Sequence, residues 1–160
     1  MADDLAARIA AFLDGHHVMS LATLGPDGPH AANLFYARDG LALLWVSDHT
    51  SRHSAELAAD ARVAATIAPD YADYAAIAGL QVSGRARRLV DDAERARARQ
   101  ILETRYAFLR HLAEAGMRER YDRAQIYRLD PDRLVLIDNT RGFGHKDVFE
   151  VTGVRPIDAE

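Results

Sequence analysis

The chain has 160 residues, of which 49% are hydrophobic and 28% are charged, the composition of a soluble domain with a sizeable core. Its 20 basic and 24 acidic residues give a net charge of −4, which argues against a general binder of nucleic acid or anionic membranes. The absence of cysteine excludes disulfides, thiolate metal sites, cysteine nucleophiles and iron–sulfur clusters.

The start of the chain, Met1 to Asp4, is acidic and leads into an amphipathic stretch, which is not the pattern of a secretory signal. No apolar run reaches the length of about 18 residues that a membrane-spanning helix needs. We therefore expect a cytoplasmic protein.

The first third of the sequence predicts one helix and three strands. Apolar residues recur at helical spacing between Leu5 and Leu13, and Gly15 can end this helix. Three β-rich runs follow, and the turns between them predict an antiparallel meander. The runs cover residues 17–24, 30–37 and 41–47, with turns at 25–28 and 39–40.

The middle of the chain continues this alternation of short elements. Residues 51–59 predict a short helix, residues 62–67 a fourth strand, and residues 69–79 a loop or helical turn. Residues 80–90 predict a long fifth strand, in which Gly84 is placed as at a β-bulge.

The last third predicts one long helix and two more strands. Asp91 and Glu94 are spaced nearly as a capping box, and the helix that they open extends to about Ala115. Strands at 125–129 and 134–138 flank a predicted turn at Asp130-Pro131-Asp132. About seven short strands with a few helices predict a mainly β (α+β) domain, built as a closed or partly closed antiparallel barrel.

The segment Thr50–His53 follows a strand that ends at Ser47 and begins a predicted helix. Hydroxyl groups, free helix N–H groups, a guanidinium and an imidazole would converge there, and together they can bind a phosphate dianion. The alternative is an ordinary Ser/Thr N-cap followed by an exposed arginine, and the sequence leaves both interpretations open.

Other candidate motifs give weaker signals. His49 and His53 are four residues apart, but a zinc site needs three or four ligands, so we expect no metal site. No G-x-S-x-G motif and no P-loop occur, so a serine hydrolase and a P-loop NTPase lack support. The arginines at 85–88 and 95–99 are interleaved with acidic residues, which predicts a salt-bridged surface.

The order of elements resembles the pyridoxamine-phosphate-oxidase-like flavin split barrels. The segments that carry this resemblance are Val18–Leu24, Asp27–His30, Leu43–His53, Arg62–Thr66 and Gln81–Gly84. The chain resembles most closely the YhbP-like bacterial branch of these proteins. The segments similar to that branch are Ala32–Tyr36, Ser51–His53, Gly79–Leu89 and Asp138–Lys146. The resemblance extends from about Leu5 to Val151, and it implies a single split-barrel domain over residues 1–160.

The resemblance implies an FMN-binding homodimer with the flavin lodged between the subunits. In such barrels a serine-arginine-lysine element binds the FMN phosphate; Ser51 and Arg52 match it, and His53 replaces the lysine. Thr50 would assist this phosphate clamp, and Asn33, Ser47 and Gln81 fall where the family lines the isoalloxazine and ribityl chain. The implied cofactor-binding residues are Asn33, Ser47, Thr50, Ser51, Arg52, His53, Gln81 and Lys146.

Three functions follow from this resemblance. The first is a flavin-dependent oxidoreductase acting on a small molecule, since a flavin needs no catalytic acid–base pair in the protein. The second is a flavin-binding carrier or redox sensor without turnover. The third is haem binding or degradation, with His145 as the candidate axial ligand. The substrate-binding arginine and histidine pattern of true pyridoxamine-phosphate oxidases is not evident, so that activity is not inferred.

The glycine-rich segment 139–146 has two interpretations. Gly142 and Gly144 permit unusual backbone angles, so the segment can be an ordered loop in which Phe143 covers a ligand ring and Lys146 meets an anion. Alternatively, it is a structural turn that leads into the apolar piece at 148–151.

Overall fold

The computed structural model describes residues 2–151, so the last part of the domain predicted over 1–160 lies outside the described residues. Within this range the strands form one antiparallel sheet in the order β2-β1-β5-β6-β7-β4-β3, and β8 pairs with β7. The strands are β1 (Val18–Gly25), β2 (Gly28–Phe35), β3 (Ala37–Asp39), β4 (Ala42–Ser47), β5 (Arg62–Ile67), β6 (Ala78–Arg88), β7 (Gln125–Asp138) and β8 (Lys146–Glu150).

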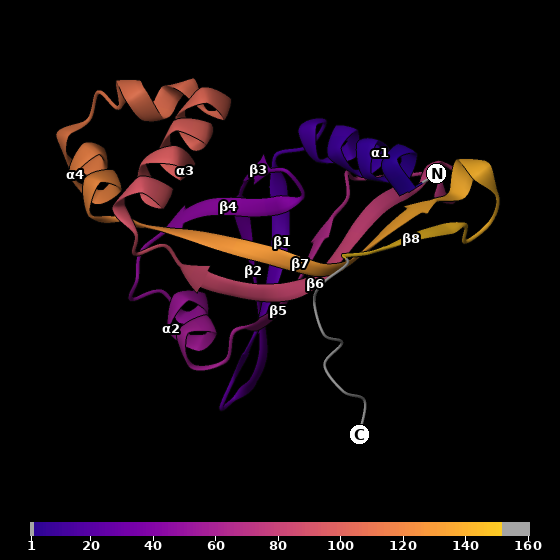
Figure 1. Cartoon of the computed structure of the whole chain (residues 1–160), viewed down its shortest axis with the longest axis horizontal. Helices are drawn as coiled ribbons and strands as arrows, with labels where there is room; N and C mark the ends of the chain where they lie inside the picture. Colours follow the sequence, from indigo (N-terminus) through magenta and orange to yellow (C-terminus); the bar gives the residue numbers. More distant parts are fainter. Residues whose placement is uncertain (1, 152–160) are drawn as a thin grey trace.

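In the described part of the chain, four helices and three 3-10 turns flank this sheet. The helices are α1 (Ala2–Asp14), α2 (Arg52–Ala59), α3 (Asp92–Arg105) and α4 (Ala115–Arg123), and the 3-10 turns are η1 (Tyr74–Ala76), η2 (Ala107–His111) and η3 (Asn139–Arg141). Figure 1 shows a strongly curled sheet in which β1 and β2 run at a steep angle to β4, β6 and β7. The predicted antiparallel split barrel with flanking helices is therefore confirmed. None of the helices between residues 2 and 151 is both long and apolar enough to cross a membrane.

The predicted bulge at Gly84 is confirmed, and it explains why the predicted turn at 130–132 is wrong. The pairing of β6 with β7 shifts register between Ser83 and Gly84, and Gly84 then lies opposite Pro131. A Cβ on Gly84 would lie 2.2 Å from the carbonyl oxygen of Asp130, so only glycine allows this close approach. The bulge accommodates the proline within one continuous strand, so residues 125–138 form β7 instead of two strands.

The single helix predicted from Asp91 to about Ala115 is also wrong. The structure ends α3 at Arg105 because Tyr106 leaves helical geometry, with φ −123° and ψ 79°. Its buried hydroxyl donates hydrogen bonds to the carbonyl oxygens of Tyr36 and His17, and these tertiary contacts compete with helix continuation. The chain continues through η2 into α4, a helix that the sequence pattern does not predict.

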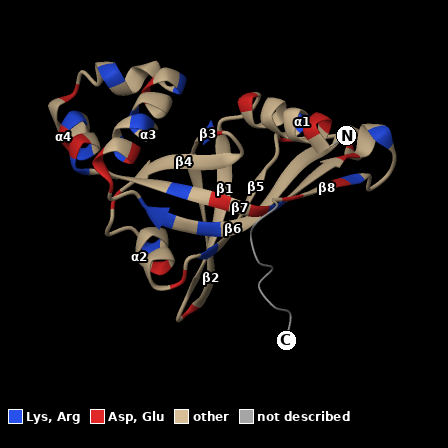
Figure 2. Cartoon of the chain, in the orientation of Figure 1, with Lys and Arg blue, Asp and Glu red and all other residues tan. Residues whose placement is uncertain are grey.

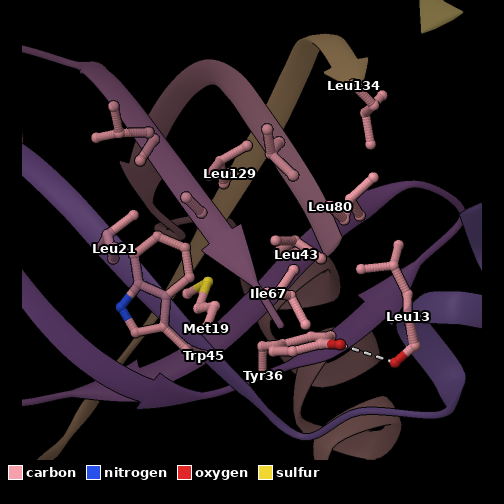
Figure 3. Packing of buried hydrophobic residues seen from close by; sticks show 14 of the residues in the cluster. Leu13, Met19, Leu21, Tyr36, Leu43, Trp45, Ile67, Leu80, Leu129 and Leu134 are labelled. Atoms are coloured by element: carbon pink, nitrogen blue, oxygen red, sulfur yellow. Dashed lines mark hydrogen bonds between the residues drawn. The ribbon is translucent and has the colours of Figure 1, made fainter. Parts of the chain in front are cut away.

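The main core fills the inside of the curled sheet and includes residues from α1. Trp45 is fully buried and stacks on Tyr127, with ring centroids 5.7 Å apart. The hydroxyl of Tyr36 donates to the carbonyl oxygen of Leu13 at 2.8 Å, which fastens the end of α1 to the sheet (Figure 3). A second cluster, which includes Leu102, packs α3 on the other face of β4.

The surface between the sheet and the helical segment from α3 to α4 is rich in ion pairs. Figure 2 shows basic and acidic positions interleaved on α3 and α4. Arg87, Arg95, Arg97 and Arg99 each lie within 4 Å of a carboxylate, which confirms a salt-bridged surface for these residues.

The segment 139–145 is the turn of the β7–β8 hairpin. Gly142 and Gly144 have φ angles of 138° and 67°, which confirms the prediction of unusual backbone angles at these glycines. Asn139 donates from Nδ2 to the carbonyl oxygen of Tyr74 at 2.9 Å, and its Oδ1 accepts from the N–H of Gly144 at 3.1 Å. The apolar piece that follows forms β8 and completes the hairpin.

Candidate functional site

The junction between β4 and α2 begins where β4 ends at Ser47. The carboxylate of Asp48 accepts both the N–H and the hydroxyl of Thr50, each at 2.8 Å, and these two hydrogen bonds lower the pKa of Asp48. Ser51 then caps α2, since its Oγ accepts the N–H of Ser54 at 3.3 Å. Ser51 is therefore an N-cap, as one of the two interpretations of this segment predicts, and the N–H groups of Arg52 and His53 have no acceptor inside the helix, so a phosphate site stays possible here.

Three of the predicted cofactor-binding side chains meet at this junction. The Nε2 atom of His53 lies 2.7 Å from the Oγ of Ser47 and 3.1 Å from the Oγ of Ser51. The hydroxyl of Ser51 also donates to Ser54 at 2.7 Å. We refer to Ser47, Ser51, His53 and Ser54 as the serine–histidine cluster.

The imidazole of His53 is only 8% exposed, and this burial determines its charge. Burial lowers the pKa of His53, the neighbouring His30 lowers it further, and Glu56 partly opposes both effects. The ring is consequently neutral at pH 7, so it does not supply the positive charge of the lysine that it replaces. His49, the other member of the histidine pair in the sequence, lies near Asp48 and makes no contact of this kind with His53 among the described residues.

Arg52 is oriented by a carboxylate that the sequence analysis did not single out. Its Nε donates to the Oε1 of Glu56 at 2.7 Å, while Thr23 donates to Oε2 at 2.6 Å. Both hydrogen bonds lower the pKa of Glu56, and the one from Thr23 has the larger effect. Half of the Arg52 side chain is exposed, and its two terminal nitrogens make no hydrogen bond within residues 2–151.

The carboxylate of Glu56 is enclosed by the β1–β2 hairpin. A Cβ on Gly25 would lie 2.3 Å from Oε1, so glycine leaves the space that this carboxylate fills. The Nδ1 atom of His30 lies 3.9 Å from Oε2 and has no hydrogen-bond partner in the described part of the chain. We refer to Thr23, Arg52 and Glu56 as the carboxylate network.

The structure places Asn33 and Gln81 in one row across the outer face of the sheet. In the strand pairing, Ser20 on β1 lies opposite Asn33 on β2 and, on its other side, opposite Thr66 on β5. Thr66 in turn lies opposite Gln81 on β6. All four side chains are exposed, and the hydroxyl of Ser20 donates to the Oδ1 of Asn33 at 2.7 Å. Ser20 and Thr66 were missed, although polar residues at alternate positions of a strand are the signal that would have indicated them.

The structure does not bring Lys146 to the start of α2. It begins β8, pairs with Ile137 on β7, and is exposed. Within residues 2–151 its amine makes no ion pair or hydrogen bond, and neither the serine–histidine cluster nor the carboxylate network includes it. Phe143, in the adjacent turn, is 79% exposed and contacts Tyr74 edge-to-face at 5.1 Å.

The donors at the start of α2 fit a phosphate group. Two first-turn N–H groups and the open side of a guanidinium lie on consecutive residues, and phosphate oxygens accept hydrogen bonds from such groups. The hydroxyls of Thr50 and Ser51 lie on the same segment and could join them by turning away from Asp48 and Ser54. The carboxylate of Asp48 opposes an anion at this point, because it lies two residues from Thr50 and is ionised. Beside this junction is a cavity of about 710 Å³, which also reaches Arg120 and Arg123 of α4.

Comparison with known proteins supports the resemblance seen in the motifs. The family model for pyridoxamine 5'-phosphate oxidase matches residues 5–142. A UPF0306 protein from Klebsiella pneumoniae (strain 342) is 33% identical over 142 residues, which cover 88% of this chain and 89% of that protein. The UPF0306 protein YhbP from Escherichia coli O157:H7 is 28% identical over 143 residues, covering 88% and 90% of the two chains.

Solved structures show the same fold. A haem-binding protein from Mycobacterium smegmatis has a TM-score of 0.71 and 26% identity; the match covers 91% of this chain but only 57% of that one. An FAD-binding protein from Mesorhizobium loti has a TM-score of 0.64 and 16% identity, with 80% and 90% coverage. The predicted split barrel and its similarity to the YhbP-like branch are both confirmed.

Proposed function

This chain belongs to the pyridoxamine 5'-phosphate oxidase family, in its YhbP-like branch, and we propose that it binds FMN and acts as a flavin-dependent oxidoreductase on a small molecule. The observation that supports this best is the orientation of Arg52. Glu56 holds its Nε, so the two terminal nitrogens remain open beside the unpaired N–H groups of the first turn of α2. A guanidinium fixed in this way can bind a phosphate through two nitrogens at once.

FMN, when bound, would supply hydride or electron transfer through its ring, while the protein supplies binding and orientation. The hydroxyls of Thr50 and Ser51, which donate to Asp48 and Ser54 in this structure, would turn to donate to the phosphate that Arg52 binds. His53 would act as a neutral hydrogen-bonding group between Ser47 and Ser51, without the charge of a lysine. Asn33 and Gln81 would line the ring and ribityl chain from the outer face of the sheet.

The absorbance spectrum of the purified protein tests the cofactor. We expect a flavin spectrum, and heat should release a compound with the mass of FMN. A colourless protein that gains no flavin spectrum on incubation with FMN would contradict the proposal. FAD or a deazaflavin in the released fraction would correct the identity of the cofactor.

Reaction with reduced nicotinamide separates an oxidoreductase from a flavin carrier or redox sensor. An oxidoreductase should lose its flavin absorbance when NADH or NADPH is added without oxygen, and should recover it when oxygen returns. A protein that binds FMN but is not reduced by either nicotinamide would favour the carrier or sensor function.

The proposal includes a homodimer with the flavin at the subunit interface. Val18 and Phe35 pair across β1 and β2 and remain 43% and 58% exposed on the outer face of the sheet. This apolar pair lies on the same face as the polar row of Asn33 and Ser20, so a second copy that covered it would also cover the row. Light scattering at micromolar concentration with FMN present should give the mass of a dimer; a strictly monomeric mass would contradict this part.

Haem binding is a second candidate because the similar structure from Mycobacterium smegmatis is named a haem-binding protein. In this chain the Nε2 of His145 is buried and lies 3.2 Å from the Oδ1 of Asp147, outside hydrogen-bonding geometry. Haem ligation would require this ring to turn away from the carboxylate. Titration with haem should therefore give no Soret shift that depends on His145; a shift that His145→Ala abolishes would favour the haem function.

A further inference from the structure

A cavity of about 710 Å³ separates the segment between β4 and α2 from the last turn of α4. Its volume is in the range of small-molecule binding pockets. It is lined by Val46, Ser47, Asp48, His49, Thr50, Arg120, Tyr121, Arg123 and Ala124. One wall therefore consists of the end of β4 and the segment that leads to α2, including Thr50 of the proposed phosphate clamp. The other wall consists of the last turn of α4 and Ala124, which follows it.

The charged groups around this cavity carry a positive excess. Arg120 makes no ion pair within residues 2–151, and Arg123 lies 3.6 Å from Glu119, a weak contact because both side chains are well exposed. Asp48, the one carboxylate in the lining within residues 2–151, already accepts hydrogen bonds from the N–H and hydroxyl of Thr50. Two guanidinium groups therefore share the cavity with one carboxylate.

The position of α4 is fixed by packing that leaves these arginines free to face a ligand. The Tyr121 ring is buried and lies under the guanidinium of Arg99, 4.8 Å from it, and its hydroxyl donates to Glu103 at 3.0 Å. Two residues beyond the end of the helix, Gln125 begins β7 and pairs with Ser47 at the end of β4. The same strand pairing therefore brings the end of α4 beside the phosphate clamp.

The clamp itself holds only one cation, Arg52, among the described residues. Its histidine is buried and hydrogen-bonded between two serines, and its arginine is partly neutralised by Glu56. A phosphate dianion at this junction would meet the carboxylates of Asp48 and Glu56 as well as Arg52. Additional cations are therefore needed near it, and Arg120 and Arg123 are the ones that line the adjoining cavity.

We infer that the cavity between the β4–α2 segment and α4 is a subsite for the phosphate-bearing tail of the flavin nucleotide, with Arg120 and Arg123 as its anion-binding residues. This inference rests on the proposed flavin function and deepens it. The shared chemistry is a phosphate or diphosphate group, and FMN and FAD are its two possible sources. Asp48 opposes the anion and limits the affinity.

If Arg120 and Arg123 had a purely structural role, we would expect a different result. Both lie in the last turn of α4, where cations stabilise the carbonyl end of the helix. In that case their removal would lower the melting temperature without changing the preference for phosphate-bearing flavins. The preference between flavins is thus the informative measurement.

The test compares wild type with an Arg120→Ala/Arg123→Ala double variant and with the control Arg118→Ala. Arg118 lies on the same helix, pairs with Asp122 and does not line the cavity. Dissociation constants for riboflavin, FMN and FAD are measured by quenching of flavin fluorescence, with melting temperatures recorded in parallel. Inorganic pyrophosphate serves as a flavin-free probe in a thermal-shift assay.

We expect the double variant to lose about tenfold in FMN affinity while its riboflavin affinity stays within twofold, a loss typical of one charge-assisted contact. Asp48→Asn, which keeps an acceptor for Thr50, should tighten FMN binding. If the double variant loses more affinity for FAD than for FMN, the subsite binds the second phosphate of FAD. An equal loss of affinity assigns the subsite to the first phosphate, which FMN and FAD share. If the double variant bound FMN as tightly as the wild type and the control do, and likewise FAD, the inference would be overturned while flavin binding stayed intact.

The pyrophosphate assay separates failure of the inference from failure of the flavin proposal. If the wild type binds no flavin, stabilisation by pyrophosphate that the double variant loses still supports an anion subsite in this cavity. No flavin binding and no stabilisation by pyrophosphate would overturn both proposals.

Discussion

The β4–α2 junction and the β7–β8 hairpin each place basic residues at the end of a strand, but their side chains are held differently. At the junction, buried Glu56 fixes Arg52 from one side and accepts a hydrogen bond from Thr23 on the other. At the hairpin, Asn139 bonds to backbone groups, and the ring of Phe143 remains exposed. The junction therefore orients a cation before any ligand arrives, whereas the hairpin fixes only the path of its backbone. Preorganisation of this kind strengthens binding because less ordering is left for the ligand to induce.

The largest expected effect comes from filling the space that Glu56 occupies. In Gly25→Ala the new Cβ would lie 2.3 Å from the Oε1 of Glu56, so the carboxylate must move away from Thr23 and Arg52. We expect the free energy of unfolding to fall by about 3 kcal/mol, the upper end for overpacking a buried site. Chemical denaturation measures it.

Two controls sharpen this prediction. In a Glu56→Ala background the clash is absent, so Gly25→Ala should cost much less there. At the hairpin, Gly144→Ala meets no atom within 4 Å and should cost about 1 kcal/mol, only for its positive φ. Equal costs at Gly25 and Gly144 would show that the junction is no more tightly packed than the hairpin.

The next effect concerns the oriented cation. Arg52→Ala should weaken FMN binding by about ten- to a hundredfold, because hydrogen bonds to charged groups contribute about 1.5–3 kcal/mol. Riboflavin, which lacks the phosphate, should bind this variant about as well as it binds the wild type. Arg62→Ala is the matched control, since Arg62 is equally exposed and also pairs with a carboxylate. If Arg52→Ala bound FMN as tightly as the wild type does, the junction would be only a helix cap and not a phosphate clamp.

A smaller effect is expected from the buried imidazole, and its sign follows from the lowered pKa of His53. The unfolded chain takes up a proton at this residue at a higher pH than the folded chain does. Stability should therefore fall as the pH drops through the ordinary histidine value of 6.5 towards the lower folded-state pKa. His53→Gln removes this titration and can still hydrogen-bond to Ser47 and Ser51.

The measurement is the free energy of unfolding of both proteins between pH 7.5 and pH 5.5, a window of about one unit on either side of that value. The slope should be shallower in His53→Gln than in the wild type. Identical slopes would show that His53 titrates in the folded protein as it does in the unfolded chain.

The smallest effect is expected at the hairpin. Phe143→Ala should change the free energy of unfolding by less than about 0.5 kcal/mol, because the ring is mostly exposed. Flavin affinity should also stay unchanged if the segment is only a structural turn. A clear loss of flavin affinity at unchanged stability would instead place the hairpin beside the ligand.

Local patterns predicted the parts of this fold that depend on neighbouring residues. The cap at Ser51, the turn before β2 and the bulge at Gly84 each follow from the backbone preferences of one or two residues. The helix break at Tyr106 and the continuous strand through Pro131 could not be predicted in this way. The first depends on hydrogen bonds to Tyr36 and His17, and the second on the glycine in the facing strand.

The same distinction holds for the candidate site. Ser47, Ser51 and His53 are close in sequence, and the structure brings them together as a cluster. Glu56 was overlooked because its role depends on Thr23, thirty-three residues away. Arg120 and Arg123 were overlooked because the sequence pattern did not indicate α4 at all. Lys146, the one predicted binding residue far along the chain, lies apart from the cluster.

The position of Trp45 has a practical consequence for all of these measurements. It is the only tryptophan in the chain, it is fully buried, and it lies two residues before Ser47 on the same strand. When the protein is excited at the red edge of its absorbance, where its six tyrosines do not absorb, the emission therefore comes from one ring at a known place in the core. Because oxidised flavins absorb in the region where tryptophan emits, a flavin bound near β4 should quench this light by energy transfer. The protein thus carries a built-in optical reporter of its own occupancy, and no label has to be attached.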